Sequence, residues 1–182
     1  MTPRTRAYID IDGCINAYGQ DTEGLTPLII PGLNGASYRV MYNRPLVEEL
    51  DALIDEFSVD AVFLTTWLKD GMIDRLVDGL DLFRSARKLP APLPRMSGFS
   101  RRWKVHALIR DLRPDPGPFC WVDDELETSF RREARNTFDV PSLLIAPDAT
   151  VGITEVHLKS MRRFFEEVWS RRQVEGGSCT EP

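Results

Sequence analysis

Two carboxylates lie two residues apart at the end of a short apolar run near the start of the sequence. Asp10 and Asp12 belong to the segment Tyr-Ile-Asp-Ile-Asp-Gly, and Gly13 follows them at once. Carboxylates are rarely buried unless they are paired or bound to a metal, so their place at the end of a buried strand needs a reason. Glycine permits backbone angles that a side chain would forbid. The pattern is suited to holding one divalent cation and to presenting one carboxylate as a nucleophile.

Polar residues also follow two later apolar runs. Thr65 and Thr66 come after Ala-Val-Phe-Leu, and Asp123 and Asp124 come after Phe-Cys-Trp-Val. In a parallel sheet, the carboxyl ends of the strands share the edge at which ligands bind. We therefore expect these side chains to converge with the first acidic pair, although they are far apart in the sequence. Thr65 and Thr66 are alternative candidates for the polar residue that follows this strand at the edge.

Predicted strands and helices alternate along the sequence. Apolar runs predict strands at residues 7–11, 61–64, 119–122 and 142–145. Apolar residues at helical spacing predict helices at about 46–57, from Met72 to Leu80, at about 102–113 and 125–135, and after Thr154. Short apolar strands that alternate with helices imply a parallel sheet covered on both faces. The predicted fold class is therefore α/β, a three-layer Rossmann-like sandwich with a mainly parallel central sheet.

The size and composition of the chain fit one globular domain. The chain has 182 residues, of which 42% are hydrophobic and 28% are charged, and this suffices for one domain with a core. We assign residues 1–170 to that domain and expect the polar residues 171–182 to form a disordered tail. Several glycines and prolines in residues 17–44 predict an irregular excursion with a hairpin around Asn34-Gly35.

The cysteine count and the hydropathy pattern indicate the cellular compartment in which we expect the protein. Cys14, Cys120 and Cys179 are an odd number without paired spacing or a zinc-binding pattern, which favours a reducing compartment. The sequence has no apolar run of transmembrane length and no apolar signal segment near its first residue. We therefore expect the protein to be cytoplasmic and to contact no membrane.

Charge is distributed unevenly along the chain. The net charge of −5 argues against nonspecific binding of nucleic acid by the whole surface. Residues 84–113 nevertheless contain nine cations against one acid, Asp111. The nine are Arg84, Arg87, Lys88, Arg95, Arg101, Arg102, Lys104, Arg110 and Arg113. Two interpretations stay open for this run: a local basic face for a polyanionic partner, or an ordinary solvated surface.

The order of the chemical residues resembles that of the haloacid dehalogenase (HAD) superfamily. The matching residues are Asp10 and Asp12 in Asp-Ile-Asp-Gly, Thr65 in Val-Phe-Leu-Thr, Lys104 in Arg-Trp-Lys-Val, and Asp123-Asp124 in Trp-Val-Asp-Asp. The resemblance covers about residues 6–170, and the two acidic motifs are more specific than the Thr and Lys motifs. It implies a phosphatase or phosphotransferase mechanism, because the second acid of the first motif favours phosphoryl chemistry over dehalogenation.

The resemblance implies a role for each matching residue. Asp10 would attack phosphorus and form an aspartyl-phosphate, and Asp12 would protonate the leaving oxygen and later deprotonate the attacking water. Thr65 would hydrogen-bond a phosphate oxygen near the main-chain donors at the start of the next helix. Lys104 would balance the charge on the nucleophile and the phosphate as a compact cation.

The resemblance also implies one bound Mg²⁺. A carboxylate cannot easily approach a phosphate dianion, because both are negative, and a divalent cation between them removes that obstacle. Asp10, the backbone carbonyl of Asp12, and either Asp123 or Asp124 would bind the ion.

The lengths of two gaps indicate how the site is covered. Members of this superfamily carry cap domains after the first or the second motif, but residues 17–44 are too short for one. The second gap, about 68–103, holds one helix and a proline-rich loop at 89–98. The chain thus resembles a member with no cap or a minimal cap, whose open site suits nucleic-acid ends or phosphoproteins. Alternatively, a partner or a second copy closes the site over a small metabolite.

The sequence therefore predicts a Mg²⁺-dependent phosphomonoesterase whose substrate is a nucleotide or a nucleic-acid end. The chain is also similar to the phosphatase domains of polynucleotide-end-healing enzymes and to small HAD domains linked to RNA repair. Two alternatives remain: a nucleic-acid-binding or partner-binding module with little catalysis, and a phosphotransferase with an acceptor other than water. Lys104 as a plain surface cation and Asp124 as a helix cap are competing structural explanations. Four further residues are expected to serve the helices and the core: His106, His157, Trp67 and Trp103.

Overall fold

The computed structural model describes residues 4–19, 23–90 and 102–176. Its central sheet has five parallel strands in the order β5-β4-β1-β6-β7. The strands are β1 Arg6–Ile9, β4 Asp60–Phe63, β5 Arg87–Lys88, β6 Phe119–Val122 and β7 Ser142–Ile145. The helices are α1 Arg44–Glu56, α2 Met72–Leu80, α3 Arg102–Leu112, α4 Thr128–Thr137 and α5 Glu155–Gly176, and a six-residue 3-10 helix, η2 Thr66–Gly71, follows β4. The predicted α/β class with a mainly parallel sheet is confirmed.

The three central strands end level with one another. Ile9 in β1 pairs with Phe63 in β4 and with Val122 in β6. Every residue of β1 and β6 is buried, as expected for strands that are covered on both faces. Asp10 and Asp123 follow the last residues of β1 and β6 and therefore emerge side by side at the carboxyl edge of the sheet.

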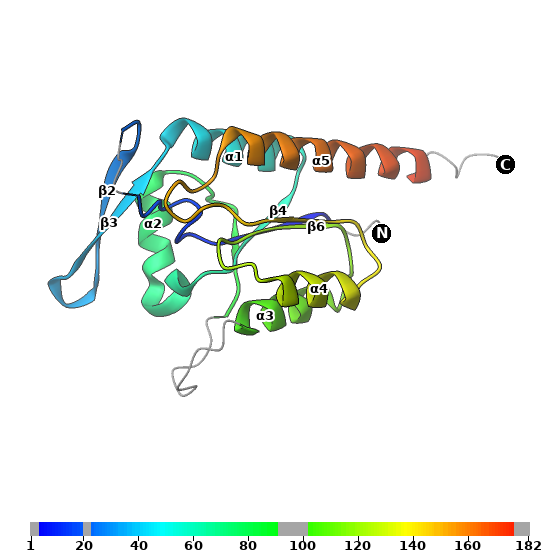
Figure 1. Ribbon diagram of the computed structural model, residues 1–182, viewed down its shortest axis with the longest axis horizontal. Coiled ribbons are helices and arrows are strands. Elements are labelled where there is room, and N and C mark those ends of the chain that lie inside the picture. Colours follow the sequence, from blue (N-terminus) through cyan, green and yellow to red (C-terminus); the bar gives the residue numbers. More distant parts are fainter. Residues whose placement is uncertain (1–3, 20–22, 91–101, 177–182) are drawn as a thin grey trace.

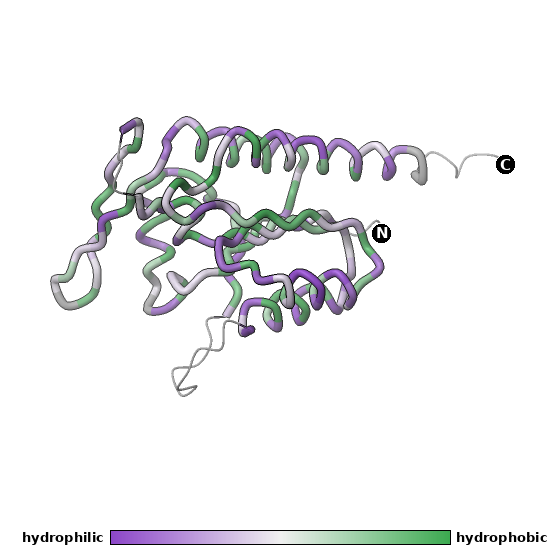
Figure 2. Tube along the Cα trace, viewed as in Figure 1, coloured by the Kyte–Doolittle hydropathy of each residue, from purple (hydrophilic) through white to green (hydrophobic). Residues whose placement is uncertain are grey.

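Helices cover both faces of the sheet (Figure 1). The helices α1 and α5 lie over one face, and α3 and α4 lie over the other. Alternate residues of β1 divide between two cores: Ala7 and Ile9 pack with α1, α2 and α5, whereas Tyr8 packs with α3 and α4. Hydrophobic residues follow the sheet, and hydrophilic residues lie on the outer sides of the helices (Figure 2). The predicted three-layer sandwich is confirmed.

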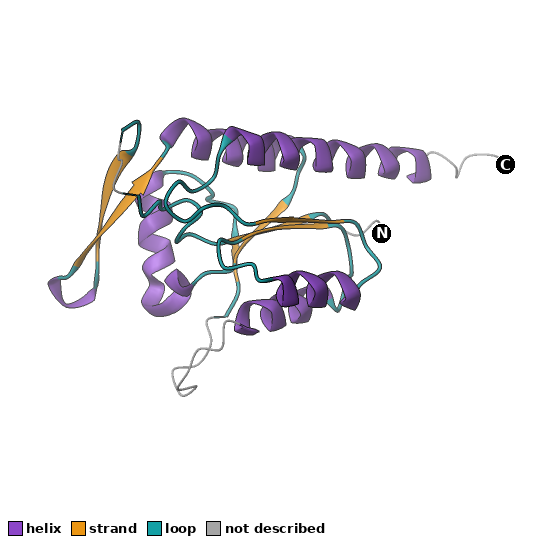
Figure 3. Ribbon diagram, in the orientation of Figure 1, coloured by secondary structure: helices purple, strands orange, loops and turns teal. Residues whose placement is uncertain are grey.

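A β-hairpin stands apart from the sheet, beside α2 (Figure 3). The strands β2 Thr26–Pro31 and β3 Ser37–Tyr42 pair antiparallel, and the 3-10 turn η1 Leu33–Gly35 joins them where the sequence predicts a hairpin. Arg75 in α2 donates a hydrogen bond of 2.5 Å from Nη1 to the Pro31 carbonyl, which fastens the hairpin to the body of the protein. Within the described residues, the hairpin is the only regular structure between β1 and α1, so the cap is minimal.

Three strand and helix boundaries differ from the prediction. β1 ends at Ile9 rather than at residue 11, so Asp10 lies just outside the strand. The short strand β5 escapes prediction because its two residues are charged and exposed. α4 begins at Thr128 rather than near residue 125, because Asp123 Oδ1 accepts a hydrogen bond from the Glu125 amide and holds that segment in a turn.

The helix α5 is longer than the sequence indicates. It begins directly after Thr154, the predicted cap, but it continues to Gly176, where the sequence predicts a polar tail from Arg171. Arginine, glutamine and glutamate are good helix formers, so an established helix extends through them. Residues 177–182, Cys179 and most of the predicted proline-rich loop lie outside the described residues. No helix in the described part of the chain has the length and apolar character that crossing a membrane requires.

Candidate active site

A single tight turn follows β1 at the edge of the sheet. The amides of Ile15 and Asn16 both donate to the carbonyl of Ile11, and the Gly13 amide donates to the Asn16 carbonyl. Gly13 has a φ of +70°, in the left-handed region that favours glycine. A Cβ on Gly13 would lie 2.3 Å from Asp124 Cγ. Gly13 therefore lets the turn after β1 pass close to the loop after β6.

Three carboxylates meet where these two loops approach each other. Asp10, Asp123 and Asp124 each place an oxygen within 4.8 Å of the others. The exposed fraction is 4% for Asp10 and 1% for Asp123, while Asp124 is partly exposed. The structure thus brings the first and the last acidic motif together, although more than a hundred residues separate them in the chain.

Lys104 joins the acids from α3, on one face of the sheet. Its Nζ lies 2.5 Å from Asp10 Oδ2 and 2.8 Å from Asp123 Oδ2. Only 7% of this residue is exposed. Lys104 is therefore a buried partner of two carboxylates, and the competing explanation of a plain surface cation is wrong.

The cluster carries more negative than positive charge. Burial raises the pKa of Asp10 to about 6; Lys104 opposes the rise and Asp123 adds to it. Burial likewise raises the pKa of Asp123 and the pKa of Asp124. Burial alone would lower the pKa of Lys104, but Asp10 and Asp123 raise it above its ordinary value, so the lysine is charged. Three carboxylates that face one ammonium leave room for a further positive charge.

The donor atoms indicate which cation would fit the cluster. All three side chains offer carboxylate oxygens, and no Cys or His within the described residues joins them. Magnesium and calcium prefer oxygen ligands, whereas sulfur and imidazole favour softer metals. The residues therefore fit a hard divalent cation.

The two threonines after β4 lie in different surroundings. Thr65 is fully buried; its hydroxyl hydrogen-bonds Asp10 and accepts a 3.3 Å hydrogen bond from the Trp67 amide at the start of η2. Thr66 is exposed and borders a cavity. Of the two candidates, Thr65 is the one in contact with the acids.

Asp12 does not belong to the three-carboxylate cluster. Its Oδ1 accepts a 3.0 Å hydrogen bond from Asn16 Nδ2, and the Tyr18 hydroxyl also hydrogen-bonds this carboxylate. Asn16 Oδ1 in turn accepts from the Met41 amide at 3.0 Å, which ties the turn to β3. Asp12 is partly exposed and borders the same cavity as Thr66. The two acids of the first motif therefore have different partners and different access to solvent.

A protein-family model matches most of the chain. That model, which describes the HAD domain in Swiss Army Knife RNA repair proteins, covers residues 7–158. The chain belongs to this HAD family. The match contains both acidic motifs, Thr65 and Lys104, and it supports hydrolase or phosphatase-like chemistry in general terms. No curated protein matches the chain.

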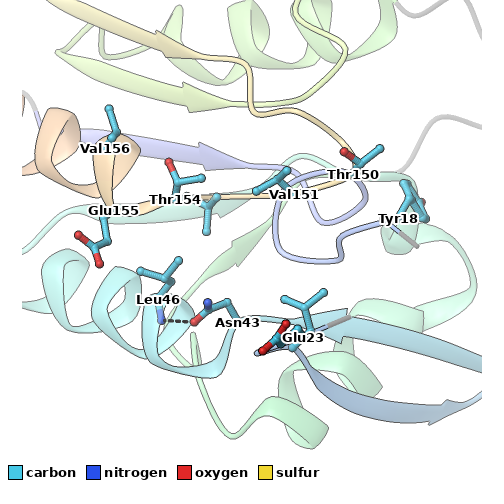
Figure 4. Close-up of a pocket in the computed structure, with 12 residues that line it drawn as sticks. Tyr18, Glu23, Asn43, Leu46, Thr150, Val151, Thr154, Glu155 and Val156 are labelled. Atoms are coloured by element: carbon cyan, nitrogen blue, oxygen red, sulfur yellow. Dashed lines mark hydrogen bonds between the residues drawn. The ribbon is translucent and has the colours of Figure 1, made fainter. Parts of the chain in front are cut away.

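Two cavities of this HAD domain lie beside Tyr18, which follows the turn after β1 and lines both. The smaller has a volume of about 370 Å³ and is bordered by the hairpin, the turn after β1 and η2; we call it the hairpin pocket. Asp12 and Thr66 line it together with Tyr38, Arg39, Trp67 and Lys69. The larger, of about 940 Å³, lies between the start of α1 and the loop into α5 (Figure 4). Neither cavity is lined by Asp10, Asp123 or Asp124, but the hairpin pocket reaches the first acidic motif through Asp12.

Sequence reasoning misses the residues that build the hairpin pocket. Asn16 and Tyr18 follow the first motif by a few residues, and this closeness is a signal that could have found them. Tyr38 and Arg39 lie on the hairpin, and no local pattern shows that the hairpin meets η2. That contact exists only because α2 holds the hairpin in place.

The basic run at residues 84–113 offers few free cations. Arg95 and Arg101 lie outside the described residues. Five of the other seven form ion pairs with carboxylates: Arg84, Arg87, Lys88, Arg102 and Lys104. These five residues serve ion pairs within the fold, and the basic face for a polyanion stays a prediction.

The remaining candidates contribute to structure. His157 Nδ1 accepts a 3.1 Å hydrogen bond from the Thr154 amide at the start of α5, and His106 lies 3.7 Å from Glu133 on the surface. Cys14 and Cys120 are buried free thiols, and burial raises the pKa of each. None of these four side chains is placed to react.

Proposed function

We propose that this HAD domain is a Mg²⁺-dependent phosphomonoesterase that works through an aspartyl-phosphate and acts on a phosphorylated nucleotide or nucleic-acid end. One observation carries the proposal. The buried carboxylate of Asp10 lies beside Lys104 and two further acids, whereas Asp12 lies outside this cluster and lines the hairpin pocket. A binding module without catalysis has no need for clustered buried carboxylates. The family supports the phosphatase class, and the substrate is our inference.

The reaction has two displacements at phosphorus. An oxygen of Asp10 attacks the phosphorus of the monoester, and the bond between phosphorus and the ester oxygen breaks. Asp12 gives its proton to the departing oxygen, so the alcohol leaves neutral. Water then attacks the aspartyl-phosphate, Asp12 takes a proton from it, and inorganic phosphate leaves as the Asp10 carboxylate is restored. General acid-base assistance of this kind contributes about 10²–10⁴ in rate.

Asp12 is suited to proton transfer by its hydrogen bonds. Asn16 and Tyr18 hold the carboxylate beside the hairpin pocket, where a leaving group or a water can reach it. Asp10 is buried and already bonded to Lys104, so it is held in one position for attack. The separation of the two acids therefore matches a nucleophile and a proton carrier.

The cation and Lys104 have complementary tasks. Asp10, Asp123, Asp124 and the backbone carbonyl of Asp12 are the ligands we propose for Mg²⁺. When bound, the ion supplies positive charge that lets a carboxylate approach a phosphate dianion. Lys104 balances the charge of the nucleophile, and the Thr65 hydroxyl, which donates to Asp10 in the free site, donates its single proton to a phosphate oxygen when substrate binds.

A phosphatase panel with Mg²⁺ and with EDTA tests this proposal. The substrates are p-nitrophenyl phosphate, mononucleotides, oligonucleotides with a 3′- or a 5′-phosphate, sugar phosphates and phosphopeptides. We expect release of inorganic phosphate that stops in EDTA and returns with Mg²⁺, with nucleic-acid ends hydrolysed fastest. Transfer of the phosphoryl group to an added alcohol instead of water would indicate a phosphotransferase. Turnover of no phosphate monoester at all would overturn the proposal.

A further inference from the structure

The hairpin pocket carries features that hydrolysis of a phosphate alone does not require. We infer that it is a subsite for one unpaired nucleobase and an adjoining phosphate, which makes single-stranded ends the preferred substrates of the site. This inference rests on the proposed phosphatase function. It assigns substrate selection to Tyr38, Trp67, Arg39 and Lys69, all of which line the pocket that also contains Asp12.

Tyr38 provides a fixed aromatic surface in this pocket. Its ring centroid lies 5.9 Å from that of Trp67 in an edge contact at 62°. A Cβ on Gly32 would lie 2.6 Å from Tyr38 Cε2, so the ring lies against the hairpin backbone at a position that only glycine leaves open. Tyr38 is nevertheless 49% exposed, whereas Trp67 is 9% exposed. Trp67 is thus mainly the support, as the sequence predicts for a packing residue, and Tyr38 is the ring on which a base can stack.

A second exposed ring lies on the acid side of the pocket. Tyr18 is 56% exposed, and its hydroxyl is held by Asp12. The pocket therefore presents apolar ring surface next to the proposed proton carrier. A substrate base held on this surface lies in the same pocket as Asp12.

Two cations of the pocket have no carboxylate to neutralise them. Arg39 and Lys69 are exposed, and neither side chain forms an ion pair or hydrogen bond within the part of the chain that the structure describes. Nearby cations are engaged: Arg75 donates to Pro31, and Lys88 pairs with Asp74. Lys104 already serves the reacting phosphate, so two further cations indicate a second phosphate of a polynucleotide chain.

The size of the pocket limits what can enter. A volume of about 370 Å³ is at the small end of ligand pockets and suits about one nucleotide. A base inside a duplex is covered on both faces, so it must be unstacked before it can reach a side chain. The combination of one small pocket, two exposed rings and two unpaired cations therefore favours an unpaired end over a blunt duplex end and over a free mononucleotide.

Kinetics with two substrates test the subsite. Tyr38→Ala is compared with wild type on p-nitrophenyl phosphate and on a single-stranded tetranucleotide phosphorylated at the end that wild type prefers. We expect kcat/KM for the tetranucleotide to fall about 5- to 150-fold and kcat/KM for the aryl phosphate to stay within about twofold. Tyr38→Phe should restore the tetranucleotide rate, and Trp169→Ala, an exposed aromatic on α5, is the matched control. An equal loss on both substrates, or no loss on either, would overturn the inference.

Salt dependence tests the two cations separately. In the double variant Arg39→Ala/Lys69→Ala, the slope of log(kcat/KM) for the tetranucleotide against log[salt] should become shallower by about 0.7, because the two cations together neutralise one phosphate and each neutralised single-strand phosphate contributes about 0.7. Arg110→Ala/Arg113→Ala removes two exposed charges at the end of α3 and should leave the slope unchanged. An unchanged slope in the first variant would overturn the assignment of a second phosphate to this pocket.

Binding without turnover separates this inference from the proposed function. In the Asp10→Asn background, a fluorescent 3′- or 5′-phosphorylated tetranucleotide should bind at least about tenfold more tightly than the matching blunt duplex, and Tyr38→Ala should abolish that preference. Binding with this pattern but no turnover of any monoester by wild type would refute the phosphatase and keep the subsite. Turnover of the aryl phosphate by wild type without this binding pattern would refute the subsite and keep the phosphatase.

Discussion

Acids lie at both edges of the central sheet, the amino edge where the strands begin and the carboxyl edge where they end, but among the described residues only the acids of the amino edge each pair with an arginine. There, Arg87 makes hydrogen bonds of 2.9–3.0 Å to both oxygens of Asp60 and to both oxygens of Asp111. Arg6 lies 3.8 Å from each of these acids and 3.2 Å from Asp115. At the carboxyl edge, three carboxylates share one ammonium.

This difference moves the acidic pKa values in opposite directions. Burial would raise the pKa of Asp111, but Arg87 and Tyr8 hold it below its ordinary value. Burial raises the pKa of Asp10 to about 6, in spite of Lys104. Acids paired with arginines at the amino edge stabilise the fold, whereas surplus negative charge at the carboxyl edge indicates a site that a ligand completes. Four measurements test this difference between the two edges.

The largest effect is expected at the carboxyl edge. Asp10→Asn removes the proposed nucleophile, so kcat for p-nitrophenyl phosphate should fall by at least about 10³-fold. The same change removes an unbalanced buried charge, so the Tm of the metal-free variant should not drop. Steady-state hydrolysis and thermal unfolding in EDTA give the two values. Activity within tenfold of wild type would exclude Asp10 as the nucleophile.

The matching substitution at the amino edge should have the reverse outcome. Asp111→Asn weakens two hydrogen bonds to Arg87 and one of 2.7 Å from the Tyr8 hydroxyl, so unfolding free energy should fall by about 1–3 kcal/mol. Activity at a temperature well below Tm should stay within about twofold. Urea unfolding and the aryl phosphate assay measure the two effects. A large loss of activity in the folded variant would show that the two edges are not independent.

The close approach of the two acidic loops can be tested with a pair of glycines. Gly13 and Gly24 both have positive φ, but only at Gly13 would a Cβ meet another group, the Asp124 carboxylate. Each change to Ala should cost about 1–2 kcal/mol of stability. Only Gly13→Ala should also reduce the rise in Tm that Mg²⁺ produces. If both variants respond equally to Mg²⁺, Asp124 does not contribute to the cation site.

The smallest effect is the pH dependence of stability in EDTA. The pKa of Asp10 is raised on folding, so its contribution is full below about pH 4 and is lost as pH rises through about 6. Wild type should therefore lose about 1 kcal/mol or more relative to Asp10→Asn between pH 4 and pH 7, or roughly 2–4 °C in Tm per kcal/mol. The lowered pKa of Asp111 works in the other direction and only below about pH 4, so it does not mask this change. Curves for wild type and Asp10→Asn that run parallel across this range would contradict the raised pKa.

The elements and the acids at the strand ends could be predicted because they depend on local patterns. Alternating apolar runs indicated the parallel sheet, and parallel strands bring Asp10 and Asp123 to one edge whatever the loops between them. Lys104 needed the resemblance to a family, because one lysine in a basic run has no distinctive spacing. The structure then shows its buried contacts with two acids.

The rest depends on contacts between segments that are distant in sequence. Nothing near Tyr38 indicates that its ring meets Trp67, since the hairpin is positioned by Arg75 of α2. The same holds at the amino edge, where Arg87 and Asp111 belong to one basic run and pair across β5 and α3. The number of charges in the run can be read from the sequence. Which of these charges are paired with an opposite charge depends on tertiary packing.

The position of β1 in the sheet determines when the acids of the site can meet during synthesis of the chain. β1 is the earliest of the five strands in chain order, yet it lies in the middle, between β4 and β6. A nascent chain therefore holds Asp10 without its second neighbouring strand until Phe119 and the residues after it leave the ribosome. Asp123 and Asp124 directly follow that same strand, so docking of β6 gives β1 its second neighbour and brings these two acids to Asp10. The cluster of three carboxylates therefore assembles only after most of the chain has been synthesised.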